Sequence, residues 1–327
     1  AEGMEGTRES LVFPCPMQTL VIGLNPAVDV EWRVAAIHWD EKNVLLGERR
    51  WAGGKSVNVA RCLRQLGGEV KLLVPLGGAT GLEIKRQLRS ERLPLHAVPV
   101  TEATRANVMV TQGSGPQLRF NPKGPKLSAH EWRTFFAVAE QEMRRSALII
   151  FSGALCRDAR PTVYRDLIRL ARRLKVPCLL DCDGEAFAAG VNAKPMLVKP
   201  NEFELAQWAG RKLGSFTALV RAARELSRVT GGWVLVSRDS HGGLLVNERE
   251  GQRWQAAVPR VKARNTVGAG DALLAAVAQQ VVRRTAPVEW LRQGLATATA
   301  FVQVPAGESV PVVAVEGMGR RIRPRPI

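Results

Sequence analysis

Predominantly apolar runs alternate with helix patterns along the second half of this 327-residue chain. The runs at 147–151, 177–180, 196–199 and 232–237 do not alternate with polar residues, which is typical of strands buried on both faces. The helix patterns between them carry start signals, such as the capping box that begins at Ser128. This alternation predicts an α/β fold, in which helices cover both faces of a mostly parallel central sheet.

A ligand is expected beyond the carboxyl ends of these strands, because open parallel sheets bind ligands in the crevice outside those ends. Polar side chains follow the same ends, including that of a first strand near residues 18–24. They are Asn25, Ser152, Asp181, Asn201 and Ser237. The sequence therefore predicts the site along this edge of the sheet.

Two segments, 29–51 and 94–120, do not follow the strand–helix alternation. Both contain short extended patterns, at 95–100, 105–111 and 117–120 in the second segment, and many charged residues. Charge-rich strands suit an exposed sheet better than a core. We expect these segments to form a small, separate sheet that lies over the site as a lid.

The remaining organisation is simple. Residues 1–16 are acidic and polar at their start, and we expect them to be a disordered extension. Residues 17–327 are expected to form one large domain, since the composition gives ample apolar residues for one large core.

The formal charge of +17 permits a nucleic acid, a membrane surface or an anionic substrate as partner. The basic residues are scattered, however, and their short clusters fall mostly at expected helix ends, where cations are favourable. One Tyr and a low aromatic content argue against a stacking platform for single strands. Because the chain also contains no apolar run of membrane-spanning length, we expect neither nucleic acid nor membrane as a partner.

The five cysteines are odd in number and show neither disulfide nor metal-ligand spacing. The four His stand apart from them, so a zinc site is not expected. Free cysteines suit a reducing compartment, and we expect the protein to be cytoplasmic.

The strongest chemical signal is the turn Asn265-Thr-Val-Gly-Ala-Gly-Asp271, which leads directly into an alanine-rich helix pattern. Such a turn offers free backbone N–H groups and the positive end of a helix dipole, and both favour an anion. Asp271 stands at the mouth of this site, where a carboxylate would repel a bound phosphate. A phosphoryl-transfer enzyme can use that carboxylate as a general base, whereas a structural turn can use it as a helix cap. Both interpretations stay open on this stretch alone.

A second glycine-rich helix start, Gly53-Gly54-Lys55-Ser56, is also suited to an anion. It is not a P-loop, because Arg49 stands where that motif requires its first glycine. The alternative is an ordinary helix-start turn with an exposed lysine.

Three further groups carry both a functional and a structural interpretation. Asn201 and Glu204 could hold water on Mg²⁺, or they could cap a helix. Asp29 could bind sugar hydroxyls, or it could stabilise a turn. Arg105 and Asn107 could face a ligand from one strand, or they could form a solvated face.

The order of these pieces resembles the ribokinase-like (PfkB) carbohydrate kinase family over nearly the whole chain from about residue 18. The matching motifs are Asn-Pro-Ala-Val-Asp at 25–29, Gly-Gly-Lys-x-x-Asn-Val-Ala-Arg at 53–61, Thr-Arg-x-Asn at 104–107, Lys-Pro-Asn-x-x-Glu at 199–204 and Asn-Thr-Val-Gly-Ala-Gly-Asp at 265–271. The first two look like the branch that phosphorylates sugar phosphates, which includes 1-phosphofructokinase and tagatose-6-phosphate kinase.

The resemblance implies a ribokinase-like three-layer α/β/α sandwich with a β-sheet lid. It implies ATP and Mg²⁺ as cofactors, with a monovalent cation as a further expectation, and a homodimer formed through the lid. The reaction would be ATP-dependent phosphorylation of a hydroxyl of a phosphorylated ketohexose, namely fructose 1-phosphate, tagatose 6-phosphate or fructose 6-phosphate. The alternatives are a kinase for an unphosphorylated sugar or nucleoside, and a sugar-phosphate-binding protein with little catalysis.

The resemblance also implies residue roles. Asp271 would be the catalytic base, and the amides of Gly268, Ala269 and Gly270 would form the anion hole. The sugar phosphate would be bound by Asp29, Lys42, Gly54, Lys55, Asn58, Arg105 and Asn107. Three of these, Lys42, Lys55 and Arg105, would hold its phosphate. The nucleotide would be bound by Lys199, Asn201, Glu204, Ser237, Gly242 and Thr266. Glu204 would also hold Mg²⁺ through water.

The chain departs from the family pattern at four places. Two of them are Ser152-Gly-Ala-Leu-Cys-Arg157, in place of Ser-Gly-Ser-Leu-Pro-Pro, and Arg119, where an acid is usual. Ser56 replaces the glycine that usually follows Gly-Gly-Lys. In the nucleotide loop, Ser237-Arg238-Asp239 stands in place of Ser-Leu-Gly, so that an aspartate occupies a position where glycine is usual.

Overall fold

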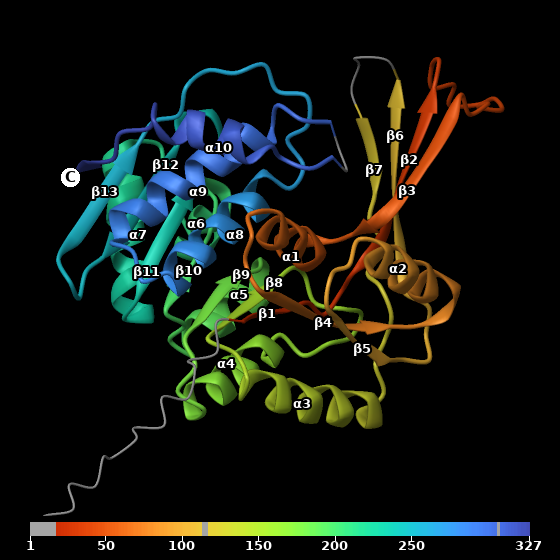
Figure 1. The fold of residues 1–327 in the computed structure, drawn as a ribbon, viewed down its shortest axis with the longest axis horizontal. Helices are drawn as coiled ribbons and strands as arrows, with labels where there is room; N and C mark the ends of the chain where they lie inside the picture. Colours follow the sequence, from red (N-terminus) through yellow and green to blue (C-terminus); the bar gives the residue numbers. More distant parts are fainter. Residues whose placement is uncertain (1–17, 113–116, 306–307) are drawn as a thin grey trace, which may run out of the picture.

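The computed structural model describes residues 18–112, 117–305 and 308–327. The predicted extension at 1–16 lies outside the described residues. Two sheets organise the described chain, one of ten strands and one of four (Figure 1).

The large sheet is parallel over seven strands and antiparallel at one edge. Its order is β14-β13-β12-β11-β10-β9-β8-β1-β4-β5. The pairs β11–β12, β12–β13 and β13–β14 are antiparallel. The strands are β1 (Thr19–Ile22), β4 (Val70–Leu76), β5 (Leu95–Pro99), β8 (Leu148–Ser152), β9 (Cys178–Asp181), β10 (Leu197–Val198), β11 (Trp233–Ser237), β12 (Gly243–Asn247), β13 (Gln252–Ala256) and β14 (Arg325–Pro326). The central strands β1, β8, β9 and β10 are buried along their full length, as their apolar runs predict.

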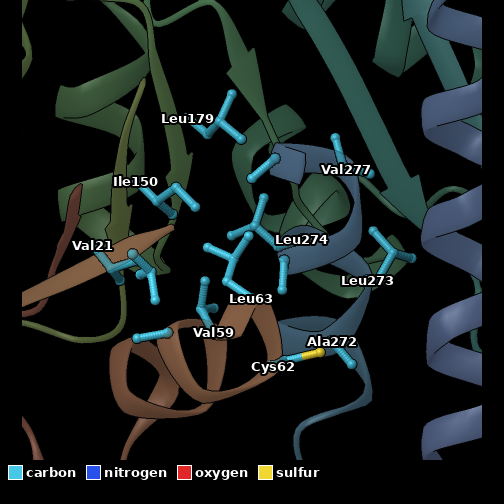
Figure 2. Packing of buried hydrophobic residues seen from close by; sticks show 14 of the residues in the cluster. Val21, Val59, Cys62, Leu63, Ile150, Leu179, Ala272, Leu273, Leu274 and Val277 are labelled. Carbon is cyan, nitrogen blue, oxygen red and sulfur yellow. The ribbon is translucent and has the colours of Figure 1, made fainter. Parts of the chain in front are cut away.

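Helices cover both faces of this sheet and complete the predicted three-layer sandwich. One face carries α1 (Lys55–Gln65), α2 (Gly78–Ser90), α8 (Ala269–Val282), α9 (Pro287–Phe301) and α10 (Val312–Gly319). The other carries α3 (Ala129–Met143), α4 (Val163–Arg173), α5 (Gly184–Val191), α6 (Glu202–Ala209) and α7 (Phe216–Thr230). Figure 2 shows how Leu63 of α1 and Leu274 of α8 pack together over Ile150 and Leu179 of the sheet. The two helices that open at the glycine-rich turns are therefore neighbours.

The small sheet has the order β3-β2-β6-β7. Its strands are β2 (Ala27–Val34), β3 (Gly47–Gly53), β6 (Arg105–Gln112) and β7 (Gln117–Phe120). It projects away from the helical layers, as Figure 1 shows. The register places Asp29 of β2 between Trp51 of β3 and Asn107 of β6.

Three sequence-based expectations need correction. Leu95–Pro99 was expected in the small sheet, but β5 pairs with β4 at the edge of the large sheet, with Leu95 opposite Leu72. Helices α5 and α10 were not predicted. The glycine-rich run at 77–81 predicts a turn that leads into a helix at 82–91, whereas α2 already begins at Gly78. In the described part of the chain, every helix is too short or too polar to cross a membrane.

Candidate active site

A cavity of about 460 Å³ lies at the carboxyl ends of the parallel strands, where the large sheet meets the small one. It collects most of the predicted site residues from segments far apart in sequence. These are Asp29, Gly54, Lys55, Asn58, Arg105, Asn107, Lys199, Asn201, Glu204, Ser237, Thr266, Gly268, Ala269, Gly270 and Asp271. The cavity therefore lies at the edge of the sheet where the strand pattern predicted the site.

The start of α8 forms one wall of this cavity. Gly268 precedes the helix with φ 91°, in the left-handed region that favours glycine. A β-carbon at this position would approach the Phe301 ring to 3.1 Å, and one at Gly270 would lie 3.3 Å from Nζ of Lys199. Small residues thus leave the amide-bearing end of α8 open to a ligand, as an anion hole requires.

Asp271 lies in the first turn of α8 and is only 6% exposed. Its Oδ2 accepts a hydrogen bond of 2.9 Å from Nδ2 of Asn58 on α1. In the described structure no side chain caps the start of α8, so Asp271 does not serve as a helix cap. Burial and the nearby charge of Asp181 raise the pKa of Asp271 from 3.8 to about 6. At neutral pH the carboxylate is ionised and ready to accept a proton.

Asp181, at the end of β9, joins two lysines that the sequence placed in separate motifs. Its Oδ1 lies 3.4 Å from Nζ of Lys55, and its Oδ2 lies 3.4 Å from Nζ of Lys199. Asp181 is fully buried, and its charge raises the pKa of Lys55 well above the usual range. Lys55 therefore remains charged beside the start of α8, and Lys199 lies against the other oxygen of the same carboxylate. The sequence indicated that Asp181 ends a strand, but it did not indicate this role.

Asp29 and Asn107 face the cavity from adjacent strands of the small sheet. Nδ2 of Asn107 donates to Oδ1 of Asp29 at 2.7 Å. Gly53 makes room for this carboxylate, since a β-carbon there would lie 1.9 Å from Oδ2 of Asp29. Burial raises the pKa of Asp29, although the hydrogen bond from Asn107 opposes the shift. The pair presents polar atoms suited to sugar hydroxyls.

Arg105 anchors the same end of the cavity. Its Nη2 donates to the carbonyl oxygen of Asn25 at 3.0 Å, and its Nη1 donates to that of Pro122 at 2.9 Å. The guanidinium thus fastens the turn after β1 to the turn after β7. Burial lowers the pKa of Arg105, and the neighbouring charge of Asp29 opposes that shift. It remains a cation at the sugar end, since an arginine pKa starts above 12.

Asn201 and Glu204 form a capping box at the start of α6. The N–H of Glu204 donates to Oδ1 of Asn201, and the N–H of Asn201 donates to Oε2 of Glu204, both at 2.8 Å. The structural interpretation of this pair is therefore correct. The cap uses one carboxylate oxygen of Glu204. The other, Oε1, faces the cavity and lies 3.9 Å from Nζ of Lys55.

The loop expected to bind the nucleotide has an aspartate in place of a glycine, and the backbone accommodates this replacement. Ser237 and Asp239 line the cavity, and Asp239 takes the left-handed conformation, with φ 43°. Aspartate adopts this region more readily than most residues, so the replaced glycine does not break the turn. Gly242 has φ 90° and packs against the carbonyl of Ala256, outside the cavity lining. Its role in the described structure is to shape the turn.

Lys42 is placed differently from the expectation. It lies in the exposed loop 37–46 between β2 and β3 and does not line the cavity. Lys55 faces Asp181 and Glu204, so the expected cradle of Lys42, Lys55 and Arg105 is not assembled.

Two other lining cations were not among the predicted site residues. Arg61 lies three residues beyond Asn58 on the same face of α1, a spacing that could have revealed it. Arg119 on β7 lies opposite Met109 of β6 and contacts the side-chain oxygen of Gln117. Its position depends on strand pairing, which the local sequence does not show.

Comparison with known proteins identifies the family. The family model described as pfkB family carbohydrate kinase matches residues 36–312. This chain belongs to that family. The family assignment agrees with a buried carboxylate at an anion-binding helix start, and the protein is an ATP-dependent carbohydrate kinase.

Curated relatives cover most of the kinase. The 1-phosphofructokinase of Escherichia coli K12 is 33% identical over 289 residues, which are 86% of this chain and 89% of that protein. The ATP-dependent 6-phosphofructokinase isozyme 2 of the same organism is 33% identical over 255 residues, covering 76% of this chain and 80% of that protein. A tagatose-6-phosphate kinase of Staphylococcus epidermidis is 27% identical over 277 residues, with coverage of 84% and 88%.

Solved structures give the same fold. Phosphofructokinase-2 from Escherichia coli in complex with potassium superposes with a TM-score of 0.87 at 27% identity, covering 93% of this kinase and 99% of that chain. Its complex with fructose-6-phosphate gives a TM-score of 0.84 at 26% identity, with the same coverage. An Arabidopsis thaliana ribokinase, at 21% identity and a TM-score of 0.75, shares the fold.

Proposed function

We propose that this kinase transfers the γ-phosphoryl group of ATP to a hydroxyl of a phosphorylated ketohexose. The candidates are fructose 1-phosphate, tagatose 6-phosphate and fructose 6-phosphate. One observation carries the proposal: the buried carboxylate of Asp271 shares a cavity with the sugar-type pair Asp29 and Asn107. The names of the 1-phosphofructokinase, 6-phosphofructokinase and tagatose-6-phosphate kinase relatives support the substrate class.

Asp271 acts as the general base in this proposal. Its carboxylate accepts the proton of the attacking sugar hydroxyl, while Asn58 holds the carboxylate in place. The amides of Gly268, Ala269 and Gly270 stabilise the charge that develops on the transferred group. Lys55 and Lys199 add two fixed cations to the same region, because Asp181 holds both ammonium groups.

The residues present fit a Mg²⁺ ion that the nucleotide carries. In the described residues, no group of three acidic, His or Cys side chains is close enough to hold a metal alone. Oδ2 of Asp181 is buried without a hydrogen-bond partner, and Oε1 of Glu204 faces the cavity. Mg²⁺ usually keeps several waters and takes one or two carboxylates plus substrate phosphates. Asp181 and Glu204 would hold such an ion, which would neutralise charge on the phosphates.

We propose that Arg105 and Arg119 hold the existing phosphate of the sugar. Both line the small-sheet end of the cavity, near Asp29 and Asn107. In the described part of the chain, neither arginine has a carboxylate within salt-bridge distance, so each guanidinium group can form an ion pair with an anionic ligand. Lys42 reaches this phosphate only if the loop 37–46 moves toward the cavity, and it is a weaker candidate.

An ADP-release assay over paired sugars and sugar phosphates tests the substrate class. We expect turnover with at least one of the three ketohexose phosphates and little with fructose or tagatose. Greater activity on the unphosphorylated sugars would instead support the alternative kinase for a neutral substrate. Binding of a sugar phosphate without ADP release would support the non-catalytic alternative.

The Arg105→Ala variant tests the phosphate contact. Loss of one charge-assisted contact should raise KM for the sugar phosphate by about tenfold to a hundredfold and leave KM for ATP unchanged. Because Arg105 also fastens two backbone turns, Arg119→Ala serves as a second variant, which keeps those bonds. A rise in KM for ATP in both variants would contradict the assignment.

Three further expectations remain proposals. We propose a monovalent cation as an activator, which the potassium complex of phosphofructokinase-2 supports by similarity. We propose a homodimer formed through the small sheet, and a cytoplasmic location that suits the four buried free thiols of the described residues. Sugar phosphate and ATP are the small-molecule partners.

A further inference from the structure

Two adjoining hollows lie along the edge of the large sheet formed by β5, outside the kinase site. The first has a volume of about 380 Å³ and the second of about 410 Å³. They share Lys85 of α2 and Ala97 of β5, so together they form one groove between this helix and the edge strand. We call it the α2–β5 groove. Nothing in the proposed phosphoryl transfer uses it.

The first hollow is cationic. Lys71, Lys85, Arg89 and His96 line it, and no carboxylate does. Behind it, the buried Glu142 lies 2.9 Å from Nζ of Lys71 and 2.7 Å from Nδ1 of His96. This carboxylate accounts for two of the four basic side chains and fixes their positions.

Lys85 and Arg89 are the two basic side chains of this hollow that are not paired with a carboxylate in the described residues. Across the residues that the structure describes, neither one has a carboxylate within salt-bridge distance. Lys85 is also half-buried, where an ammonium without a counter-ion is less favourable than in water. The two side chains lie four residues apart on α2 and so face the same side of the helix. A bound anion would supply the missing charge.

The rest of the groove is apolar. Leu93, Leu95 and Ala97 form the floor of the first hollow. The second hollow is lined, apart from Lys85, by apolar side chains and glycines. These are Leu76, Gly77, Gly78, Gly81, Leu82, Ala97, Pro99 and Val100. The combined shape suits a ligand with an anionic head and a compact apolar body.

An added β-strand is a poorer occupant than a small molecule. β5 is the terminal strand of the sheet, and no strand of the described residues pairs with its outer edge. It has only five residues and ends at Pro99, which has no N–H to donate to a partner strand. Short, proline-ended edges resist strand addition, and the cationic rim next to this one favours an anion.

We propose that the α2–β5 groove binds a phosphate monoester whose organic part is small and apolar. The phosphate lies between Lys85 and Arg89, and the organic part lies in the second hollow over Ala97. The charge-assisted bonds to the two cations give affinity, while the apolar lining selects esters over inorganic phosphate.

Lysine footprinting with phenyl phosphate as the probe tests this site directly. Brief acetylation followed by peptide mass spectrometry reports each lysine separately, so protection of Lys85 reports binding in the groove alone. Lys55 of the kinase cavity stays protonated against Asp181 and reacts too slowly to contribute to this signal. We expect phenyl phosphate to slow acetylation of Lys85 and to half-protect it at a concentration at least about fivefold lower than inorganic phosphate does. Phenol should not protect it.

Matched variants complete the test. Arg89→Gln should raise the half-protecting concentration of phenyl phosphate at Lys85 by about tenfold. Arg169→Gln removes the same charge from an exposed position on α4 and should behave as the unmodified protein. The proposal is overturned if Lys85 is not protected, if Arg89→Gln protects it as well as Arg169→Gln does, or if phenol is as effective as its phosphate ester. These outcomes are independent of whether the kinase accepts a ketohexose phosphate.

Discussion

At the residue scale, the chemistry depends on the charge of Asp271. Within the described residues, the buried carboxylate accepts a hydrogen bond from the side chain of Asn58 and lies near the positively charged Lys55 and Lys199. As a general base it should contribute on the order of 10²–10⁴ in rate. Asp271→Asn preserves the shape of the side chain but removes the proton acceptor. We expect kcat to fall at least about a hundredfold, with near-normal folding and KM values. Retention of most of the turnover would assign the base to another residue.

The same side chain sets a pH dependence of activity. The pKa of Asp271 is raised from 3.8 to about 6, so the base is progressively protonated below that pH. We expect kcat/KM of the unmodified kinase to decrease tenfold per pH unit below about pH 6. The residual activity of Asp271→Asn should lack this limb. A limb of the same position in the variant would show that another group titrates there.

Ionisation of Asp271 also lowers the stability of the folded protein. The pKa of Asp271 in the folded protein lies above its unfolded value, so the free energy of unfolding is highest below about pH 4, where the carboxyl is protonated in both states. This stability is lost as the pH rises from about 4 to 6 and is absent at higher pH. The difference of about two pKa units corresponds to about 3 kcal/mol. Asp271→Asn should therefore unfold at higher urea than the unmodified protein at pH 8, and the difference should vanish near pH 4. Asp40→Asn, in an exposed loop, is the control and should change neither value. Equal stability at pH 8 would contradict the buried, ionised carboxylate.

At the element scale, the start of α8 depends on a glycine that performs two tasks. Gly268 takes φ 91°, and a β-carbon there would crowd Phe301. Gly231, at the end of α7, has φ 67° but open space around it. Alanine at either position should cost about 1–2 kcal/mol through backbone strain. Gly268→Ala should lose additional stability and most of kcat, whereas Gly231→Ala should keep its activity. Equal losses with kcat preserved would show that the turn at 265–268 is not part of the catalytic site.

The helices and strands that could be predicted from the sequence are those with a clear local pattern. The helix starts at Ser128 and Asn201 follow from capping boxes, and both boxes are present. α5 and α10 were missed because their patterns are short and weak, with small residues in one and valines in the other. β5 was assigned to the wrong sheet because its partner, β4, is determined by tertiary packing rather than by its own residues.

At the scale of the whole molecule, the site is formed by residues that are far apart in the sequence and meet in the fold. Asn58 and Asp271 are 213 residues apart and share a hydrogen bond because α1 and α8 pack side by side. Most of the site residues predicted from the family motifs therefore line the cavity. The sequence missed the link from Lys55 through Asp181 to Lys199, because no local pattern shows that two strand ends and one helix start meet. Lys42 was misplaced for the same reason, since its loop stays outside the cavity.

The outer part of the small sheet carries the clearest evidence for a second copy of the chain. Trp39 and Leu46 in the loop 37–46 and Phe120 on β7 are 79%, 68% and 56% exposed, and large apolar side chains exposed on one element are typical of an interaction site. We expect the unmodified kinase to sediment as a dimer and Leu46→Glu to sediment as a monomer, because burying an unpaired carboxylate in the interface is unfavourable. Val313→Glu places the same charge at an equally exposed valine on α10 and should leave the dimer intact. A monomeric unmodified protein, or dissociation by both variants alike, would remove the small sheet as the interface.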